Sequence, residues 1–385
     1  MGLFSKKEER YVGVDIGAGG VKLVELLFEG GVYKLMTYGF TQRSAEVAEL
    51  PITDDVNEAT RHVKRLMQEA GAKATRAVAS LPVHAVFSSM IAIPRVQDPA
   101  ETRALVERQA EKLMPIPLNE MVIDFQFVGG KTAQTPAALS AAVLSNKERI
   151  ESAGRAQENV RVLITGAKKS MIQTYTSVFQ GAGLELVSLE TEPFALVRSL
   201  IGSDKSPIMM LDIGSFRTNM TIVEEGVPFL TRSIKVGGAL VTRTMAEQLS
   251  VNVEEAEQMK HDLARSQEQS VPKAVQDLFQ PIVNEIAYAM RLYAESDVTN
   301  HRRVEKVILT GGSAHLPGLD VFLTEKLNVR TMVGDPWVRV QVNEAMRSLL
   351  EDVGPRFSVA IGLAMHAASP AKETKPAAPK QMQTA

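Results

Sequence analysis

The feature that most constrains this fold is a strand–turn–strand pattern that occurs twice in the chain. In residues 11–26, two apolar stretches flank the turn sequence DIGAGG, which begins at Asp15. In residues 209–223 they flank DIGSFR, which begins at Asp212. Apolar and β-branched residues around a small, glycine-containing turn indicate a β-hairpin, which is common when it occurs once. Two copies, each opening one half of the chain, predict a duplicated fold whose hairpins face each other across a cleft.

The chemistry of these turns indicates a nucleotide phosphate as the ligand. Gly17, Gly19 and Gly20 leave the first turn nearly free of side chains, so its backbone N–H groups can approach a bulky anion. Asp15 and Asp212 stand at the mouths of the two turns. A carboxylate in that place can orient Mg²⁺ through the water ligands of the ion. The two hairpins together therefore predict a site for a triphosphate and its magnesium ion.

Composition narrows the functional classes. The chain has 385 residues, of which 45% are hydrophobic and 23% charged, as is typical of a soluble protein with two or more domains. The formal net charge is −2 and no basic, aromatic-rich segment occurs, so we expect no nucleic-acid partner. The absence of cysteine excludes disulfides and thiolate metal sites and fits a reducing cytoplasm. We expect no transmembrane segment and no signal peptide, because the apolar runs are too short.

The order of the expected elements divides the chain into lobes. Residues 1–10 are a flexible start, residues 11–82 and 184–205 a first lobe that opens as β-β-β-α-β, and residues 83–183 an inserted α+β subdomain. Residues 206–367 are the second lobe, with residues 239–300 as its helical subdomain, where Pro281 is expected to kink or split a helix. A last helix is expected over residues 357–367. Residues 368–385 contain no large apolar side chain except Met382, so we expect a disordered tail.

Four glycine-rich or acidic stretches follow predicted strands, at residues 15–20, 192–193, 212–219 and 311–313. Ligands of open sheets bind where strand ends converge, so we expect these stretches to meet. The arrangement suits ATP, with both hairpins on the phosphates and the bare backbone of Gly311 and Gly312 against the adenosine. Lys22 has two open interpretations, as a phosphate donor or as a surface lysine.

The set of motifs resembles the actin-like ATPase superfamily. The motifs are DIG with VK after the first turn, EP at a helix start, DIG again, VGG, and LTGGS followed by LPGL. Within the superfamily the chain is most similar to the PilM family of type IV pilus assembly proteins, relatives of the division protein FtsA. Residues 112–118 (KLMPIPL) before VIDFQ and residues 309–319 are similar to further segments of that family. The resemblance covers residues 11–367.

The resemblance implies an α/β fold with two lobes, each with a duplicated β-β-β-α-β-α core, around a nucleotide cleft. It assigns Asp15 and Asp212 to the water-mediated Mg²⁺ site and Glu192 to the orientation or deprotonation of the attacking water. The implied phosphate-site residues are Gly17, Ala18, Gly19, Gly20, Lys22, Gly214, Ser215, Phe216, Arg217, Thr218 and Asn219. The implied ribose and adenine residues are Gly237, Gly238, Glu257, Lys260, Gly311, Gly312 and Ser313.

Some of these assignments compete with plainer interpretations. For Glu257 and Lys260 we favour the solvated face of a helix over a nucleotide contact. The first turn carries Ala-Gly-Gly where the family more often has serines, so hydroxyl contacts to phosphate are lost while backbone contacts persist. The segment 131–159 is longer than the family leads us to expect.

The resemblance implies a cytoplasmic ATP-binding scaffold of the type IV pilus machine, held at the inner membrane through partner proteins. Its implied principal partner is the cytoplasmic N-terminal segment of a PilN-like inner-membrane protein, bound in a groove between the first lobe and the insert. Other inner-membrane or motor components of the machine and a second copy of the chain are further expected partners. ATP hydrolysis, if present, is expected to be slow. The alternatives are an FtsA-like membrane-associated filament protein and, less favoured, a small-molecule kinase of the same fold.

Overall fold

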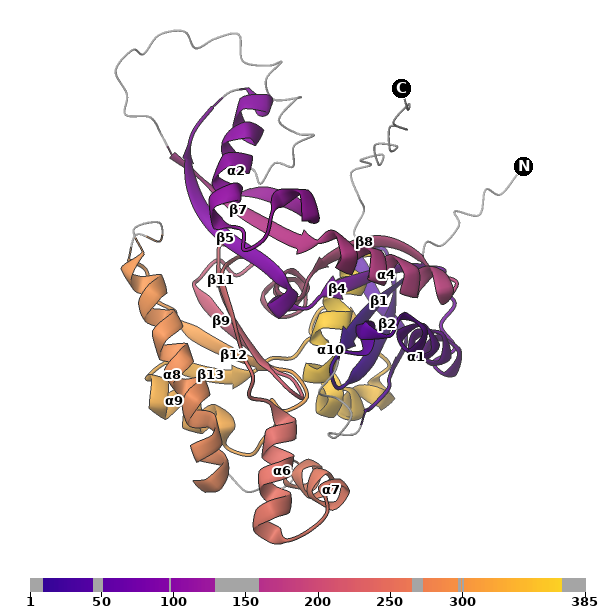
Figure 1. Ribbon diagram of the computed structural model, residues 1–385. Coiled ribbons are helices and arrows are strands. Elements are labelled where there is room, and N and C mark those ends of the chain that lie inside the picture. The colour runs from indigo at the N-terminus through magenta and orange to yellow at the C-terminus, as the bar shows by residue number, and fades with distance from the viewer. Residues whose placement is uncertain are drawn as a thin grey trace, which may run out of the picture.

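The computed structural model describes residues 10–43, 51–96, 98–128, 159–264, 273–296, 299 and 301–368. The expected flexible start and disordered tail lie almost entirely outside these residues, as does the segment 131–159 apart from its last residue. The described strands form sheets of six, five and three strands, with helices packed around them (Figure 1).

The six-stranded sheet is the centre of the first lobe. Its strands are β1 (Tyr11–Gly17), β2 (Gly20–Glu29), β3 (Val32–Phe40), β4 (Arg76–Leu81), β8 (Glu185–Thr191) and β14 (Val340–Gln341), in the order β14-β3-β2-β1-β4-β8. β1, β2 and β3 are antiparallel neighbours, whereas β4 lies parallel to β1 and β8 parallel to β4. Two helices, α1 (Val56–Glu69) and α4 (Lys169–Gly181), pack against this sheet in one apolar cluster.

The five-stranded sheet repeats this plan in the second lobe. Its strands are β9 (Ile208–Ile213), β10 (Thr218–Glu224), β11 (Val227–Ile234), β12 (Lys306–Thr310) and β13 (Arg330–Val333), in the order β11-β10-β9-β12-β13. β9 to β11 are again antiparallel, and β12 is parallel to both β9 and β13. Its helices are α6 (Gly238–Leu249), α7 (Val253–Ala264), α8 (Lys273–Glu295) and α9 (Leu319–Leu327). The shared strand order confirms the predicted duplication.

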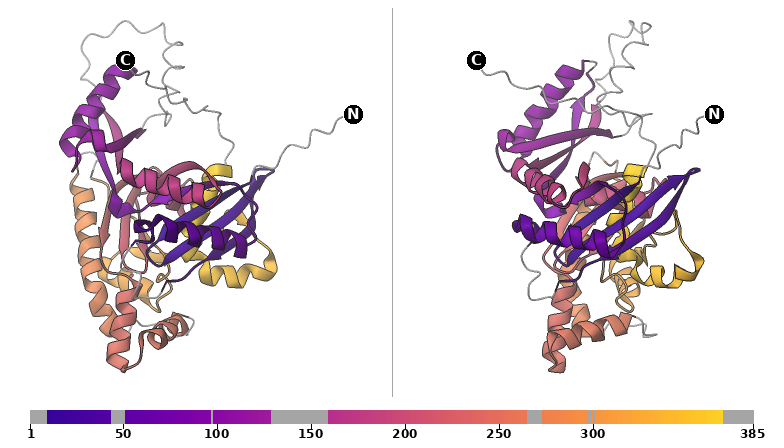
Figure 2. Two further views of the ribbon diagram at one scale, coloured as in Figure 1. Left: turned by 45° about the vertical axis from the view of Figure 1, so that its right-hand side comes forward. Right: turned by 90° about the vertical axis from the view of Figure 1, so that its right-hand side faces the viewer.

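The insert is a small α+β unit that stands above both lobes in Figures 1 and 2. It holds β5 (Val86–Pro94), β6 (Met121–Val128) and β7 (Asn159–Lys168), which form an antiparallel sheet in the order β5-β7-β6, and α2 (Pro99–Leu113). Asp98 caps α2, because its side chain accepts a hydrogen bond from the backbone N–H of Ala100 at 3.0 Å.

Two helices join the lobes. α5 (Glu192–Leu196), which continues as a π-helical turn (Val197–Ile201), and α10 (Arg347–Ala368) lie between the two large sheets. Their side chains share one apolar cluster with Val78 on β4, Met210 on β9 and Ile308 on β12. Figure 1 shows the yellow α10 beside the indigo strands β1 and β2. The assignment of residues 206–367 to the second lobe is therefore wrong for β14 and α10, because β14 pairs with β3 and α10 packs on β1 and β2.

Two further expectations differ from the structure. α4 was expected in the insert, but its apolar side chains Tyr175, Val178 and Phe179 pack in the core of the first lobe with α1. Pro281 does not split its helix: α8 continues through it, because the burial of its neighbours Phe279 and Ile282 outweighs the lost backbone hydrogen bond.

Candidate functional site

The first turn joins β1 to β2 at the edge of a cleft. The register continues to the pair Gly17 and Gly20, which leaves a two-residue turn, and it places Asp15 opposite Lys22. The Nζ of Lys22 lies 2.9 Å from Oδ2 of Asp15, and both side chains are largely buried. Burial acts to lower the pKa of Lys22, but the Asp15 carboxylate more than offsets it, and the pKa is raised. Lys22 is thus a charged partner of Asp15 in the cleft wall rather than a surface lysine.

The second turn joins β9 to β10 in the corresponding place. Asp212 on β9 is paired with Asn219 on β10, and the turn is closed by a hydrogen bond from the N–H of Gly214 to the carbonyl of Arg217 at 2.9 Å. The backbone beyond β11 supports this turn, because the N–H of Gly238 donates to the carbonyl of Gly214 at 2.9 Å.

The two turns meet directly. A Cβ atom built on Gly19 would lie 2.2 Å from the Oγ of Ser215, so a side chain at this point of the first turn would displace the Ser215 hydroxyl. Both turns line a cleft of about 990 Å³. A space of this size is large enough for a nucleotide.

Three carboxylates from separate elements face this cleft. They are Asp15 on β1, Asp212 on β9 and Glu192 at the start of α5. Burial raises the pKa of Asp212 to about 6, with the charge of Asp15 acting in the same direction. Burial, followed by the charges of Asp15 and Asp212, also raises the pKa of Glu192 well above its ordinary value. Such a cluster is unfavourable as three anions, and it therefore suits a site that receives a cation.

Glu192 is held by two donors. Its Oε2 accepts a hydrogen bond from the side-chain amide of Asn219 at 3.0 Å and one from the backbone N–H of Val83 at 3.4 Å. The carboxyl group is thereby fixed between the second turn and the start of the insert. The other amide atom, Oδ1 of Asn219, is buried and has no hydrogen-bond partner among the described residues.

The far end of the cleft is built from glycines. Gly311 has a φ of +89° and follows β12, and a Cβ there would lie 2.4 Å from Oδ1 of Asp212. A Cβ on Gly238 would lie 2.3 Å from the Oγ of Ser313. The resulting surface is bare backbone, as the sequence predicted for the adenosine side.

A polar cluster closes this end. Glu257 on α7 accepts hydrogen bonds from Lys260 at 2.6 Å and from Thr242 of α6, and its other carboxylate oxygen lies 3.2 Å from Nε2 of His261. Burial raises the pKa of Glu257, but these partners lower it further, and the net result is a pKa of about 2. Lys260 is buried. The solvated helix face that we favoured for Glu257 and Lys260 is therefore wrong, because both side chains form part of the cleft wall.

Most of the predicted site residues come together in this one cleft, and two do not line it. Gly20 has a φ of +135° and packs against Thr41, and the buried Thr218 donates to the carbonyl of Val236 at 2.7 Å. Both support the turns from behind. The predicted residues that line the cleft are Asp15, Gly17, Ala18, Gly19, Lys22, Glu192, Asp212, Gly214, Ser215, Phe216, Arg217, Asn219, Gly237, Gly238, Glu257, Lys260, Gly311, Gly312 and Ser313.

Arg356 of α10 also lines the cleft and was not among the residues predicted from the sequence. Its guanidinium lies 4.7 Å from the centre of the Phe40 ring, and a Cβ on Gly312 would be 3.7 Å from its Nε. Burial lowers the pKa of Arg356. Gly354 and Pro355 suggest a helix break, so the last helix was expected to begin only at Phe357. Arg356 was therefore left outside the predicted helix.

A sequence model described as type IV pilus assembly protein PilM matches residues 13–156 and 143–368 of the chain. The chain belongs to the PilM family. A solved PilM–PilN type IV pilus biogenesis complex has a similar fold, with a TM-score of 0.73, 24% identity, and coverage of 94% of this chain and 99% of that one.

More distant relatives share the same fold. The cell division protein FtsA of Neisseria meningitidis serogroup B is 21% identical over 94% of this chain and 91% of its own length. The ethanolamine utilization protein EutJ of Salmonella typhimurium is 27% identical over 39% of this chain and 48% of its own length. MreB5 of Spiroplasma citri has a TM-score of 0.50 at 10% identity, with 93% and 95% coverage. This PilM-family chain therefore has the fold of the actin-like ATPases.

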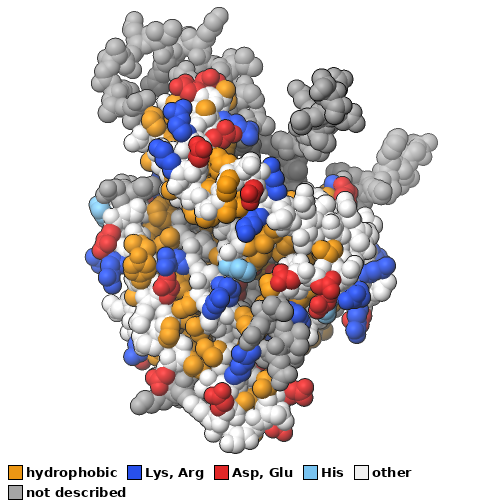
Figure 3. Space-filling model, in the orientation of Figure 1, with side chains coloured by type: hydrophobic (Ala, Val, Ile, Leu, Met, Phe, Trp, Pro, Cys, Tyr) orange, Lys and Arg blue, Asp and Glu red, His pale blue; other side chains and the backbone are white. Residues whose placement is uncertain are grey.

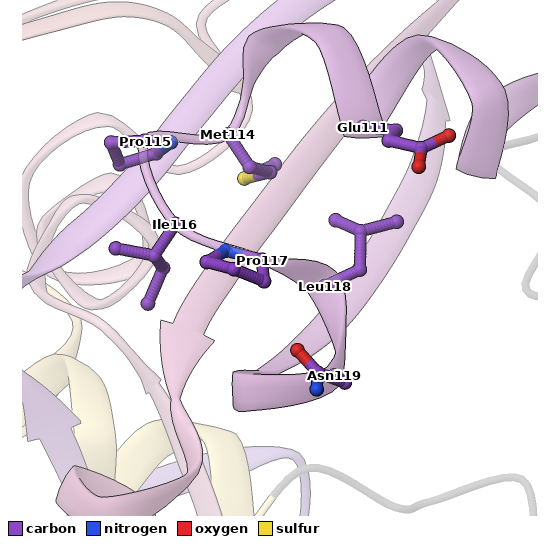
Figure 4. A pocket seen from close by; sticks show the side chains of 7 residues that line it. All are labelled: Glu111, Met114, Pro115, Ile116, Pro117, Leu118 and Asn119. Atoms are coloured by element: carbon purple, nitrogen blue, oxygen red, sulfur yellow. The ribbon is translucent and has the colours of Figure 1, made fainter.

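A second hollow of about 500 Å³ lies on the insert, after α2 (Figure 4). It is lined by Glu111, Met114, Pro115, Ile116, Pro117, Leu118 and Asn119, a segment that includes most of the KLMPIPL motif.

On the face in Figure 3, Lys and Arg lie interspersed with Asp and Glu rather than in one basic patch. Among the described helices, none combines the length and apolar character needed to cross a membrane.

Proposed function

We propose that this PilM-family protein is an ATP-binding scaffold of the type IV pilus assembly machine, with Mg-ATP held between its two lobes. The observation that carries the proposal is the meeting of the two glycine turns, from opposite halves of the chain, in one cleft. MreB5 of Spiroplasma citri, which shares the fold, was solved with AMPPNP and with ADP, and this supports a nucleotide as the ligand.

Each part of the cleft has a chemical role in this proposal. Backbone N–H groups of the two turns bind the phosphates, while the glycine surface near Gly311 and the cluster around Glu257 hold the adenosine. Asp15 and Asp212 orient Mg²⁺ through its water ligands, and the ion neutralises phosphate charge when bound. No group of three acidic, histidine or cysteine side chains in the described chain could hold a metal directly, which fits a water-mediated site.

Glu192 is the candidate residue for activating the attacking water molecule. Its carboxyl group is positioned by Asn219, and as a carboxylate it can orient or deprotonate a water molecule near the last phosphate. We expect turnover to be slow, because a nucleotide that acts mainly on the shape of the protein needs only slow hydrolysis.

Calorimetry with Mg-ATP tests the nucleotide site. We expect Asp15→Ala and Asp212→Ala each to weaken Mg-dependent binding at least about tenfold, since each removes a charged group that orients the ion. Both variants should remain folded by circular dichroism. Asp352→Ala on the exposed surface of α10 is the matched control and should bind as the wild type does. Unchanged affinity in both cleft variants would contradict the assignment.

We further propose that the chain binds the cytoplasmic N-terminal segment of a PilN-like inner-membrane protein, in a groove between the first lobe and the insert. The similarity to the solved PilM–PilN complex over nearly the whole chain supports this partner. The protein would then lie at the cytoplasmic face of the inner membrane, near other pilus components. Apolar side chains of the insert, such as Ile116 and Leu118 in the hollow of Figure 4, are candidate contacts.

A pulldown with a peptide of that PilN-like segment tests the partner, with and without Mg-ATP. Capture by the wild type, weakened by Ile116→Asp, is the expected result. Lys34→Asp on the exposed face of β3 serves as a control for added acidity and should leave capture unchanged. If the wild type captures no peptide under either condition, this partner is wrong.

The FtsA match over 94% of the chain favours one second candidate, a filament-forming protein. Sedimentation of the purified chain with Mg-ATP discriminates the two: a nucleotide-dependent pellet supports filaments, and a monomeric supernatant supports the scaffold.

A further inference from the structure

The first glycine turn is held by the residues that follow β3. The N–H of Thr41 donates to the carbonyl of Val21 at 2.8 Å, and the N–H of Val21 donates to Oγ1 of Thr41 at 2.9 Å. Two residues later, the N–H of Arg43 donates to the carbonyl of Gly19 at 3.1 Å. The pairing of β2 with β3 thereby continues past the end of β3 to the tip of the turn.

The side chain of Arg43 adds a second contact with this turn. Its Nη1 donates to the carbonyl of Ala18 at 3.4 Å, and its Nη2 lies 3.7 Å from Oε1 of Glu58 on α1. The side chain is 8% exposed, and the residue lines the cleft. Burying a guanidinium group is costly unless it is paired and hydrogen-bonded. These two contacts meet that cost and fix the group between α1 and the turn.

The contact with Ala18 determines the direction of a backbone donor. In a trans peptide, the C=O group of one residue and the N–H group of the next point in opposite directions. Since the carbonyl of Ala18 points toward Arg43, the N–H of Gly19 points away from it. Among the turn hydrogen bonds of the described residues, this N–H is not used as a donor. Gly19 faces Ser215 of the second turn across the cleft, so its N–H is available there to an anion.

We propose that Arg43 is a positioning residue of the phosphate site. Its guanidinium group holds the carbonyl of Ala18 and thereby directs the N–H of Gly19 into the cleft. This inference rests on the proposed binding of Mg-ATP. It adds a residue that lies outside the glycine motifs, and through Glu58 it connects α1 with the first turn.

Calorimetry on Arg43→Gln, with Mg-ATP and with adenosine, tests the role. We expect Mg-ATP binding to weaken about 3- to 10-fold, since one oriented donor is lost, while adenosine binding stays unchanged. A purely structural arginine would affect both ligands alike. Arg43→Lys keeps one donor for the Ala18 carbonyl and should lose less affinity. Arg65→Gln breaks an exposed ion pair on α1, with Glu69, and is the matched control: it should bind Mg-ATP within about twofold of the wild type.

Glu58→Gln separates positioning from simple charge attraction. If Arg43 positions the turn, this substitution loosens the guanidinium group and should weaken Mg-ATP binding about 2- to 3-fold. If Arg43 acts by its charge alone, removing the neighbouring acid should instead strengthen binding, and this result would contradict the inference. The inference is also wrong, and the nucleotide site stands, if Arg43→Gln binds Mg-ATP as tightly as the wild type while Asp15→Ala does not. If the wild type itself binds no Mg-ATP, both are wrong.

Discussion

At the scale of single residues, the cleft carboxylates make the ligand-free protein less stable at neutral pH. The pKa of Asp212 is about 6 in the folded chain, against an ordinary value of 3.8. Below about pH 4 both states are protonated and the group has no effect. Between pH 4 and 6 the folded state holds a proton that the unfolded state has lost, so the free energy of unfolding falls as pH rises. Above pH 6 the full penalty applies, at most about 3 kcal/mol.

Asp212→Asn removes that penalty. We therefore expect the variant to unfold at a higher temperature than the wild type at pH 7.5, and by a clearly smaller margin at pH 5. Scanning calorimetry without nucleotide measures both differences, with Asp352→Asn as the exposed control. A larger gain at pH 5 than at pH 7.5 would show that Asp212 is not held with a raised pKa.

The contact between the two turns depends on a single residue, Gly19. A Cβ on Gly19 would overlap the Oγ of Ser215, so Gly19→Ala should displace the Ser215 hydroxyl where the turns meet and weaken Mg-ATP binding about 3- to 10-fold. The double variant Gly19→Ala with Ser215→Gly removes the overlapping atom and should recover most of the affinity. Calorimetry on the three proteins decides: failure of the double variant to recover would contradict the direct contact.

At the scale of elements, β10 connects the proposed nucleotide site with the insert. It begins at Thr218 beside the second turn and ends at Glu224, whose buried carboxylate pairs with Arg161 of β7 at 3.3 Å and with Arg302 at 3.2 Å. The insert is therefore attached by its chain connections to the first lobe and by Arg161 to the second. If nucleotide binding changes the angle between the lobes, the insert would move with them.

Arg161→Gln should loosen this attachment. Since Glu224 keeps Arg302, we expect a loss of about 1–3 kcal/mol in the free energy of unfolding and faster hydrogen exchange in β7. Arg103→Gln on α2 breaks an exposed ion pair of the same insert, with Glu107, and should change stability by less than about 0.5 kcal/mol. Equal effects of the two substitutions would refute the special role of Arg161.

The bounds of elements with a strong local pattern can be predicted from the sequence. This holds for β4 (Arg76–Leu81) and β6 (Met121–Val128), because a buried apolar run or an alternating pattern ends at a turn residue. β13, α9 and β14 were not predicted: β13 is a four-residue strand defined by its pairing with β12, which no local pattern reveals. The glycine turns of the site can be recognised from their local sequence. Arg356 and Tyr175 could not be predicted in this way, because they reach the cleft only through the packing of α10 and α4.

At the scale of the whole molecule, the two lobes are joined through α5 and α10, and their sheets share an apolar cluster. The cleft proposed to bind nucleotide opens beside this junction, so a ligand that contacts both turns would hold the lobes in one relative orientation. Figures 1 and 2 show that the insert stands at one end of the molecule, above the junction. A nucleotide bound in the cleft would thereby set the angle between the lobes and the surface that the insert offers to a partner.

The most direct test of that account is hydrogen exchange followed by mass spectrometry, with and without Mg-ATP. Because the ligand is proposed to lie between the halves of the chain, peptides covering residues 15–22 and residues 212–219 should both gain protection, together with residues 310–313. Protection of one turn alone, or of neither, would contradict the claim that the two turns close on the same triphosphate.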